Sequence, residues 1–124
     1  KGELIMVVDD EEELREMAKQ IFEKKGFRVL IAGDAHAAVY MYREHARDIR
    51  LVILDMILPG VDGPRVYREL RNINSEPKII LTSGYINHPQ FQEIIEHDAD
   101  AFIAKPWDLP DLIRETTRVL KNLN

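Results

Sequence analysis

The residues best suited to chemistry lie around an apolar segment that ends in a carboxylate. Residues 51–54 are all apolar, Asp55 follows them, and Pro59-Gly60 comes shortly after. Such a run is typical of a strand buried on both faces, and Pro-Gly favours a turn. Because burying an ionised carboxylate is costly, we expect Asp55 at the solvent-facing end of its strand. Open α/β sheets bind their ligands at that edge.

A second acidic group follows another apolar run. Residues 4–8 are apolar and lead into Asp9-Asp10. If the two strands are parallel neighbours, Asp9, Asp10 and Asp55 meet at one edge, where their mutual repulsion calls for a cation. Oxygen ligands without Cys or a nearby His favour Mg²⁺. An Asp beside Mg²⁺ can accept a phosphoryl group as an aspartyl phosphate.

A hydroxyl and an ammonium group are expected at the same edge. Ser83 follows the strand-like segment 78–82, and Lys105 follows the apolar segment 101–104. The ammonium group could pair with phosphoryl oxygens, and the hydroxyl could hydrogen-bond another. Phosphoryl transfer depends mainly on positioning and charge neutralisation. The acid pair Asp9-Asp10, the nucleophile Asp55, the Ser83 hydroxyl and Lys105 are therefore sufficient for it.

The elements that must position these side chains alternate between strand and helix patterns. We expect strands at residues 4–8, 27–32, 51–54, 78–82 and 101–104. Apolar residues at helical spacing predict helices near 14–25, 35–46, 64–72, 89–97 and 109–120, with Asp34 capping the second and Gly26 ending the first. This alternation predicts an α/β fold, a parallel sheet with helices on both faces.

Length and composition indicate a single domain that spans residues 1–124. The formal net charge of −5 argues against a nucleic-acid partner. The absence of Cys excludes disulfides, and no apolar run approaches the roughly 18 residues that span a bilayer. No signal-peptide pattern is present, so we expect a cytoplasmic domain without membrane contact. Because the first residue is Lys1, we also expect a segment of a longer protein.

Taken together, the motifs resemble a two-component response-regulator receiver domain over essentially the whole chain. The segments that carry the resemblance are Val8-Asp9-Asp10-Glu11, the Asp55 strand with Pro59-Gly60 and Gly63, Thr82-Ser83-Gly84-Tyr85, and Lys105-Pro106. The resemblance implies a flavodoxin-like (βα)5 fold, a five-stranded parallel sheet with strand order 2-1-3-4-5. It also implies a phosphoacceptor signalling module of a phosphorelay, not an enzyme by itself.

The resemblance assigns the phosphoacceptor and the metal ligands. It implies that Asp55 accepts the phosphoryl group. Asp10 and Asp55 would bind Mg²⁺ together with the backbone carbonyl of Ile57, and Asp9 would act mainly through water. Lys105 would pair with the phosphoryl group, and the Lys105-Pro106 bond is often cis in this family.

The resemblance also implies a switch. Ser83 lies 22 positions before Lys105 and matches the switch hydroxyl, for which Thr82 is the weaker candidate. Phe102, three positions before Lys105, matches the switch aromatic. The phosphodonor would be a histidine kinase or a histidine phosphotransfer domain. An output partner or a second copy would bind at residues 88–122.

Three features depart from the usual receiver pattern or point to a subgroup. Asp98 stands where many members have Gly, so a left-handed residue there would be strained. Trp107 replaces the usual Phe, which indicates a packing variant. The Ser83-Gly84-Tyr85 segment resembles receivers attached to hybrid sensor kinases, in which case the parent chain would be a histidine kinase.

Alternative interpretations of the chain and of single residues remain open. A degenerate receiver would bind partners without phosphorylation, and an aspartyl-nucleophile phosphatase would instead carry Asp-x-Asp on its first strand. A flavodoxin-like nucleotide binder lacks support because no phosphate loop follows that strand.

Segment 11–13 is best explained as acids that complement a helix N-terminus. Taken singly, Asp55, Ser83 and Lys105 could be solvated loop, turn and surface residues. We expect His36, His45, His88 and His97 at the surface, and Tyr85, Phe91 and Trp107 in packing roles.

Overall fold

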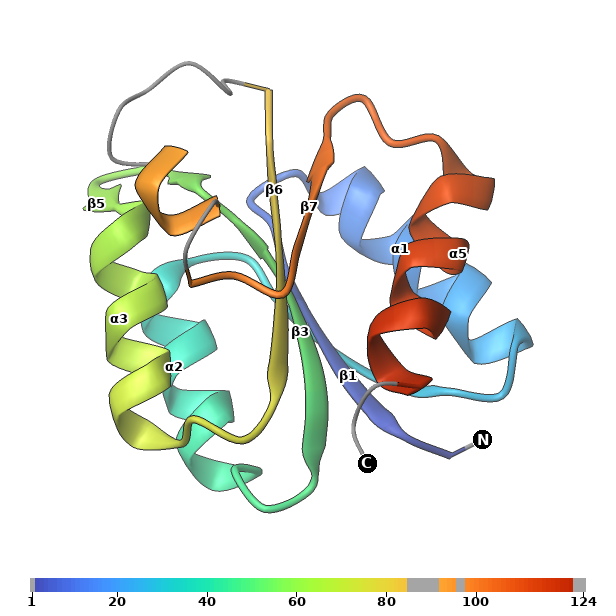
Figure 1. Cartoon of the computed structure of the whole chain (residues 1–124), viewed down its shortest axis with the longest axis horizontal. Helices are drawn as coiled ribbons and strands as arrows, with labels where there is room; N and C mark the ends of the chain where they lie inside the picture. The colour runs from blue at the N-terminus through green and yellow to red at the C-terminus, as the bar shows by residue number, and fades with distance from the viewer. Residues whose placement is uncertain (1, 85–91, 96–97, 122–124) are drawn as a thin grey trace.

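The chain folds into a five-stranded parallel sheet with helices on both faces (Figure 1). The computed structural model describes residues 2–84, 92–95 and 98–121. The sheet has the order β2-β1-β3-β6-β7, and each neighbouring pair is parallel. Its strands are β1 (Leu4–Val8), β2 (Arg28–Ala32), β3 (Ile49–Asp55), β6 (Lys78–Ser83) and β7 (Ala101–Ala104). This confirms the predicted order 2-1-3-4-5, because β4 and β5 form a separate hairpin.

Helices cover both faces of the sheet. Helices α2 (Ala35–Glu44) and α3 (Gly63–Ile73) lie on one side, and α1 (Glu12–Lys24) and α5 (Leu109–Lys121) lie on the other (Figure 1). Of the helix predicted at 89–97, residues 92–95 are helical and 89–91 and 96–97 lie outside the described residues. No helix in the described part of the chain is long and apolar enough to cross a membrane.

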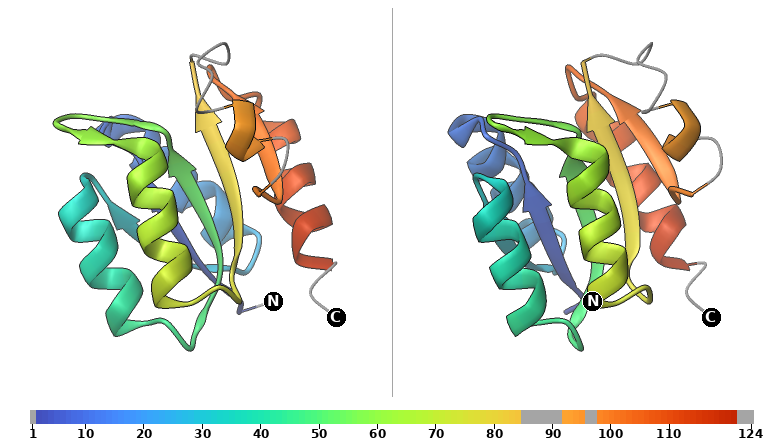
Figure 2. Two further views of the ribbon diagram at one scale, coloured as in Figure 1. Left: turned by 60° about the vertical axis from the view of Figure 1, so that its left-hand side comes forward. Right: turned by 90° about the vertical axis from the view of Figure 1, so that its left-hand side faces the viewer.

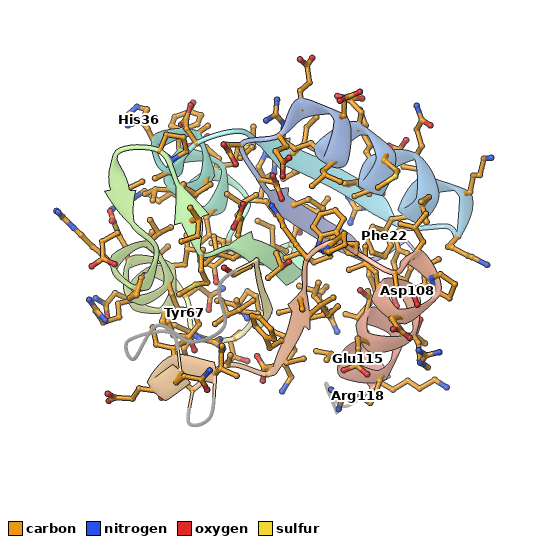
Figure 3. All side chains as sticks on the ribbon, turned by 90° about the horizontal axis from the view of Figure 1, so that it is seen from above. Phe22, His36, Tyr67, Asp108, Glu115 and Arg118 are labelled. Carbon is orange, nitrogen blue, oxygen red and sulfur yellow. The ribbon has the colours of Figure 1, made fainter. Side chains whose placement is uncertain are left out.

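The alternation of side chains along the strands divides the core into two layers. Residues 52 and 54 of β3 pack with Tyr42 and Leu70 beneath α2 and α3, whereas residues 51 and 53 pack with Phe22 and Leu112 beneath α1 and α5. Seen from above, Phe22 and Tyr67 lie on opposite sides of the sheet (Figure 3). Burial on both faces explains why β3 is apolar from Leu51 until it reaches Asp55.

A short hairpin at the carboxyl ends of the strands was not predicted. Strands β4 (Ile57–Leu58) and β5 (Val61–Asp62) pair antiparallel around the expected Pro-Gly turn, where Gly60 has a φ of 73°. The hairpin projects from the edge of the molecule near the start of α3 (Figure 2). Asp98 shows no strain of the kind considered above, since no non-glycine residue in the described segments has a positive φ.

Candidate functional site

Three Asp side chains meet where β1 and β3 end. The parallel register pairs Val8 with Leu54, so the residues that follow these two positions are brought to the same edge of the sheet. Carboxylate oxygens of Asp9, Asp10 and Asp55 lie within 4.8 Å of one another. Asp9 and Asp55 are buried, whereas Asp10 is exposed. The structure therefore brings together the acidic cluster that the sequence predicted.

Lys105 supplies a positive charge to this cluster. Its Nζ lies 2.7 Å from Asp9 Oδ2, 2.8 Å from Asp55 Oδ2 and 3.2 Å from Glu11 Oε2. The residue follows β7, and its backbone N–H donates to the carbonyl of Ser83 at 3.0 Å. The Lys105-Pro106 peptide bond is cis. Lys105 thus faces the carboxylates directly, as its position after β7 predicted.

Backbone N–H groups fix the other oxygens of the two buried carboxylates. Glu11 N–H donates to Asp9 Oδ1 at 2.9 Å, and Ile57 N–H donates to Asp55 Oδ1 at 3.0 Å. Each carboxylate is therefore oriented with its Oδ2 toward Lys105. The two backbone hydrogen bonds and the shared ammonium group of Lys105 partly compensate two charges that would otherwise be costly to bury.

The surroundings raise the pKa of both Asp55 and Lys105. Burial raises the pKa of Asp55, and the hydrogen bonds from Lys105 and Ile57 only partly oppose this rise. Burial would lower the pKa of Lys105, but its hydrogen bonds to Asp55 and Asp9 outweigh that effect and hold this pKa above its ordinary value. Lys105 therefore stays protonated, and ionised Asp55 is held in a site that disfavours its charge.

A pocket of about 400 Å³ opens beside the cluster. The residues lining it are Asp10, Glu11, Asp55, Ile57, Leu58, Pro59, Gly84 and Lys105. The charged side chains that line it are carboxylates, apart from the ammonium group of Lys105. Hard cations such as Mg²⁺ prefer carboxylate and carbonyl oxygens as ligands. The cluster of three carboxylates is consistent with a Mg²⁺ site.

The predicted switch residues lie on β6 and β7. Ser83 is buried at the end of β6, and its backbone pairs with Ala104 of β7. Phe102 is half-buried against the core layer beneath α2 and α3. Thr82 is fully buried and accepts a hydrogen bond from Trp107 Nε1 at 2.7 Å. The hydroxyl of Thr82 is thus bound to Trp107, whereas a switch hydroxyl has to be available to a phosphoryl oxygen.

Two contacts at the site were not predicted. Segment 11–13 was expected only to complement a helix N-terminus, which fits Glu12 and Glu13 in the first turn of α1, but Glu11 also contacts Lys105. Arg15 Nη1 donates to the backbone carbonyl of Asp9 at 2.8 Å. Spacing alone offers little signal for either contact, because each depends on how the loop between β1 and α1 turns.

The expected surface and packing residues can be checked only in part. His36 is exposed, as expected, and His45 is half-buried. Trp107 is half-buried and packs against the apolar layer beneath α1 and α5, as a packing variant should. The expectations for Tyr85, His88, Phe91 and His97 fall outside the described residues.

Known proteins resemble this chain in both sequence and fold. The family model of the response regulator receiver domain matches residues 5–117. The chemotaxis protein CheY of Bacillus subtilis is 33% identical over 121 residues, which cover 97% of this chain and 93% of CheY. The chain spans about half the length of other curated relatives that it matches.

Solved structures agree with this assignment. A CheY-like receiver domain from Methanospirillum hungatei superimposes with a TM-score of 0.89 at 26% identity, covering 99% of this chain and 97% of that one. The structure of a CheX–CheY–BeF3–Mg²⁺ complex from Borrelia burgdorferi gives a TM-score of 0.85 at 26% identity, covering 94% and 87%. Sequence, fold and the strand-end acidic cluster agree, and the chain belongs to the family of response regulator receiver domains of two-component systems.

Proposed function

We propose that this chain is the phosphoacceptor module of a two-component phosphorelay, and that Asp55 receives the phosphoryl group. The donor would be the phosphohistidine of a histidine kinase or of a histidine phosphotransfer domain. The observation that carries the proposal is the position of Asp55. Its carboxylate is buried at the end of β3, lies 2.8 Å from Lys105 Nζ and lines the pocket.

Each residue around Asp55 has a role in the transfer. An oxygen of the Asp55 carboxylate attacks phosphorus while the bond from phosphorus to the donor nitrogen breaks. The Ile57 N–H fixes Oδ1 and thereby limits the orientations of the nucleophile. Lys105 stays protonated and pairs with an oxygen of the incoming phosphoryl group, which stabilises its charge during transfer. Ser83 would hydrogen-bond another of these oxygens.

Asp10 and Asp55, with the backbone carbonyl of Ile57, would hold Mg²⁺, and Asp9 would act through water. When bound, Mg²⁺ neutralises charge on the phosphoryl oxygens. The local charge balance supports this assignment. Asp9, Glu11 and Asp55 share the ammonium group of Lys105, and the carboxylate of Asp10 lies within 4.8 Å of those of Asp9 and Asp55. The related CheX–CheY complex from Borrelia burgdorferi contains Mg²⁺ together with BeF3.

Intact-mass measurement after incubation with acetyl phosphate tests the assignment. In Mg²⁺, the wild-type chain should gain the mass of one phosphoryl group, and Asp55→Asn should gain none. Removal of Mg²⁺ with EDTA should abolish the gain. Asp62→Asn is the matched control, because Asp62 is an exposed carboxylate on β5 whose side chain makes no capping hydrogen bond to α3.

Two results would contradict the proposal. Equal uptake by wild type and Asp55→Asn would place the phosphoryl group on another residue. No uptake by the wild-type chain in Mg²⁺ would favour a receiver that binds its partners without phosphorylation.

The output surface that we propose comprises residues 88–122. Its described part includes β7, α5 and a hollow of about 490 Å³ between them, which Phe102, Ala104, Asp108 and Arg114 help to line. Because Phe102 and Lys105 both belong to the segment that ends β7, a change at the pocket can reach this surface through a single strand. A protein partner or a second copy of the chain would bind there.

A further inference from the structure

Trp107 is the only tryptophan of the chain, and a side-chain hydrogen bond anchors its indole. It follows the cis Lys105-Pro106 bond, and its indole Nε1 donates to Thr82 Oγ1 at 2.7 Å. Thr82 is fully buried, so the indole N–H of the half-buried Trp107 supplies a partner for a hydroxyl that water does not reach. The loop after β7 is therefore attached to β6 by one directional side-chain bond.

Thr82 is also the direct neighbour of the proposed phosphoacceptor. It pairs with Asp55 in the register of β3 and β6, and its carbonyl accepts a hydrogen bond from Met56 N–H at 3.0 Å. The indole thus holds on to the strand position beside Asp55, one residue before Ser83. The hydrogen bond therefore fixes the orientation of the Trp107 indole relative to Asp55, and not only relative to the loop after β7.

The face of the same indole lies next to the Lys105 ammonium. Lys105 Nζ is 5.9 Å from the centre of the Trp107 ring, within the range of a cation–π contact. A lysine side chain is flexible along its whole stem, so its ammonium group needs neighbours that restrict it. Asp9, Asp55 and Glu11 contact Lys105 through their carboxylates, and the Trp107 ring adds an apolar neighbour.

We propose that Trp107 is a positioning residue for Lys105: its N–H bond to Thr82 fixes the indole, and the indole face holds the ammonium group toward Asp55. This inference rests on the proposed function, because Lys105 matters for rate only if Asp55 accepts a phosphoryl group. A phenylalanine would fill much of the same apolar space but could not bond to Thr82. The replacement of Phe by Trp therefore adds a directional constraint as well as volume.

Removal of the bond from either side should produce the same defect. Trp107→Phe removes the donor, and Thr82→Val removes the acceptor at nearly constant volume. With acetyl phosphate and saturating Mg²⁺, each variant should be phosphorylated about three- to ten-fold more slowly, the range expected from the loss of one hydrogen bond. The double variant should be no slower than the slower single variant, because both changes remove one interaction. The Mg²⁺ affinity should stay at the wild-type value.

Thr116→Val is the matched control. Thr116 is also a fully buried threonine, but within the described residues its hydroxyl has no hydrogen-bond partner. Its replacement should leave the phosphorylation rate unchanged. A rate equal to wild type in Trp107→Phe and Thr82→Val would overturn the proposal, and so would fully additive losses in the double variant.

A second readout uses the metal-free chain and needs no phosphorylation. The ring current of the indole should shift the Lys105 Hε resonances upfield in proton NMR, and Trp107→Leu should abolish this shift. Thr82→Val should reduce the shift and speed exchange of the indole N–H. Absence of an upfield shift in wild type would refute the contact. If wild type takes up no phosphate, the proposed function fails, and this spectrum alone decides whether Trp107 positions Lys105.

Discussion

Asp9 and Asp55 are carboxylates that the fold removes almost completely from water, with exposed fractions of 0% and 2%. Both remain compatible with a stable fold because each accepts one backbone N–H bond and lies against the Lys105 ammonium. The compensation is incomplete, since the pKa of Asp55 is still raised. The site thus holds a carboxylate whose charge is not fully matched, which a divalent cation would correct.

The raised pKa of Asp55 predicts a pH-dependent gain from Asp55→Asn in EDTA. The folded chain binds a proton at Asp55 more readily than the unfolded chain does, for which the pKa is about 3.9. As the pH rises from about 4 through the folded pKa, wild type therefore loses stability relative to the uncharged variant. Urea unfolding between pH 4 and pH 8 should show Asp55→Asn more stable than wild type near neutrality, with less difference in acid. A difference that does not depend on pH would contradict this explanation.

Removal of Asp10 should have opposite effects with and without metal. Asp10 is the exposed member of the acidic cluster, so Asp10→Ala relieves repulsion and should stabilise the metal-free chain by about 0.5 kcal/mol. The same change should abolish most of the stabilisation that Mg²⁺ gives to wild type. Thermal melts in EDTA and in Mg²⁺ measure both effects, with Asp62→Ala as the control. A clear loss of stability in EDTA would mean that Asp10 supports the loop before α1 instead.

The residues of the pocket were predictable to different degrees. Asp55, Ser83 and Lys105 could be placed because each ends or directly follows a strand, and the strands of a parallel sheet end at a common edge. The bond from Trp107 to Thr82 and the contact of Glu11 with Lys105 could not be predicted. They depend on loop geometry and side-chain direction, on which hydrophobic periodicity carries no information.

At the scale of single elements, the turn after Asp55 is fixed by a close approach that only glycine allows. A Cβ on Gly63 would lie 2.0 Å from the carbonyl oxygen of Met56, so any side chain there would force the start of α3 away from the end of β3. The sequence predicted the Pro-Gly turn but not the hairpin around it. Strands of two residues, such as β4 and β5, are too short to show an alternating pattern.

Arg71 joins three elements at the other end of the sheet. Its guanidinium donates to the Tyr67 hydroxyl at 3.1 Å, to the Pro77 carbonyl at 2.8 Å and to Asp100 Oδ2 at 3.0 Å. Asp100 also accepts from the Ile79 N–H at 2.8 Å. The end of α3 is thereby connected to the starts of β6 and β7.

We expect Arg71→Met to destabilise the chain by about 1.5–3 kcal/mol, because it leaves buried and half-buried acceptors without their charged donor. Solvent limits the loss to this range, since 21% of the Arg71 side chain is exposed. Arg68→Met, at an exposed position of α3, is the control and should change stability by no more than about 0.5 kcal/mol. Urea unfolding at neutral pH measures both. Equal effects of the two substitutions would show that the Arg71 contacts contribute nothing specific.

At the scale of the whole molecule, the alternation of strands and helices was sufficient to predict a parallel sheet covered on both faces. The order of the strands was not contained in that alternation and came from the resemblance to receiver domains. The two core layers follow from the apolar character of β3, whose successive side chains point to opposite faces. This arrangement places the pocket at one end of β3, with β6 and β7 as the route from Asp55 toward α5.

The switch that we expect uses this route. An aspartyl phosphate would attract the hydroxyl of Ser83, which is buried beside β7, and the half-buried Phe102 would turn into the space that Ser83 leaves. Moving an equilibrium from 1:99 to 99:1 needs about 5.5 kcal/mol. One or two charge-assisted hydrogen bonds of about 1.5–3 kcal/mol each barely reach this value. We therefore expect a partial shift in the isolated chain, which a partner or a second copy completes.

Amide NMR with Mg²⁺ and beryllofluoride, a mimic of the phosphoryl group, tests this switch. In wild type, chemical-shift changes should spread from the pocket to residues 88–104, and in Ser83→Ala they should stay near Asp55 and Lys105. Ser75→Ala is the control and should behave as wild type, because Ser75 is an exposed residue in the loop before β6, far along the strand from Ser83. The Ser83 hydroxyl is the group that must move, so identical spreading in wild type and Ser83→Ala would show that the signal leaves the pocket by another path.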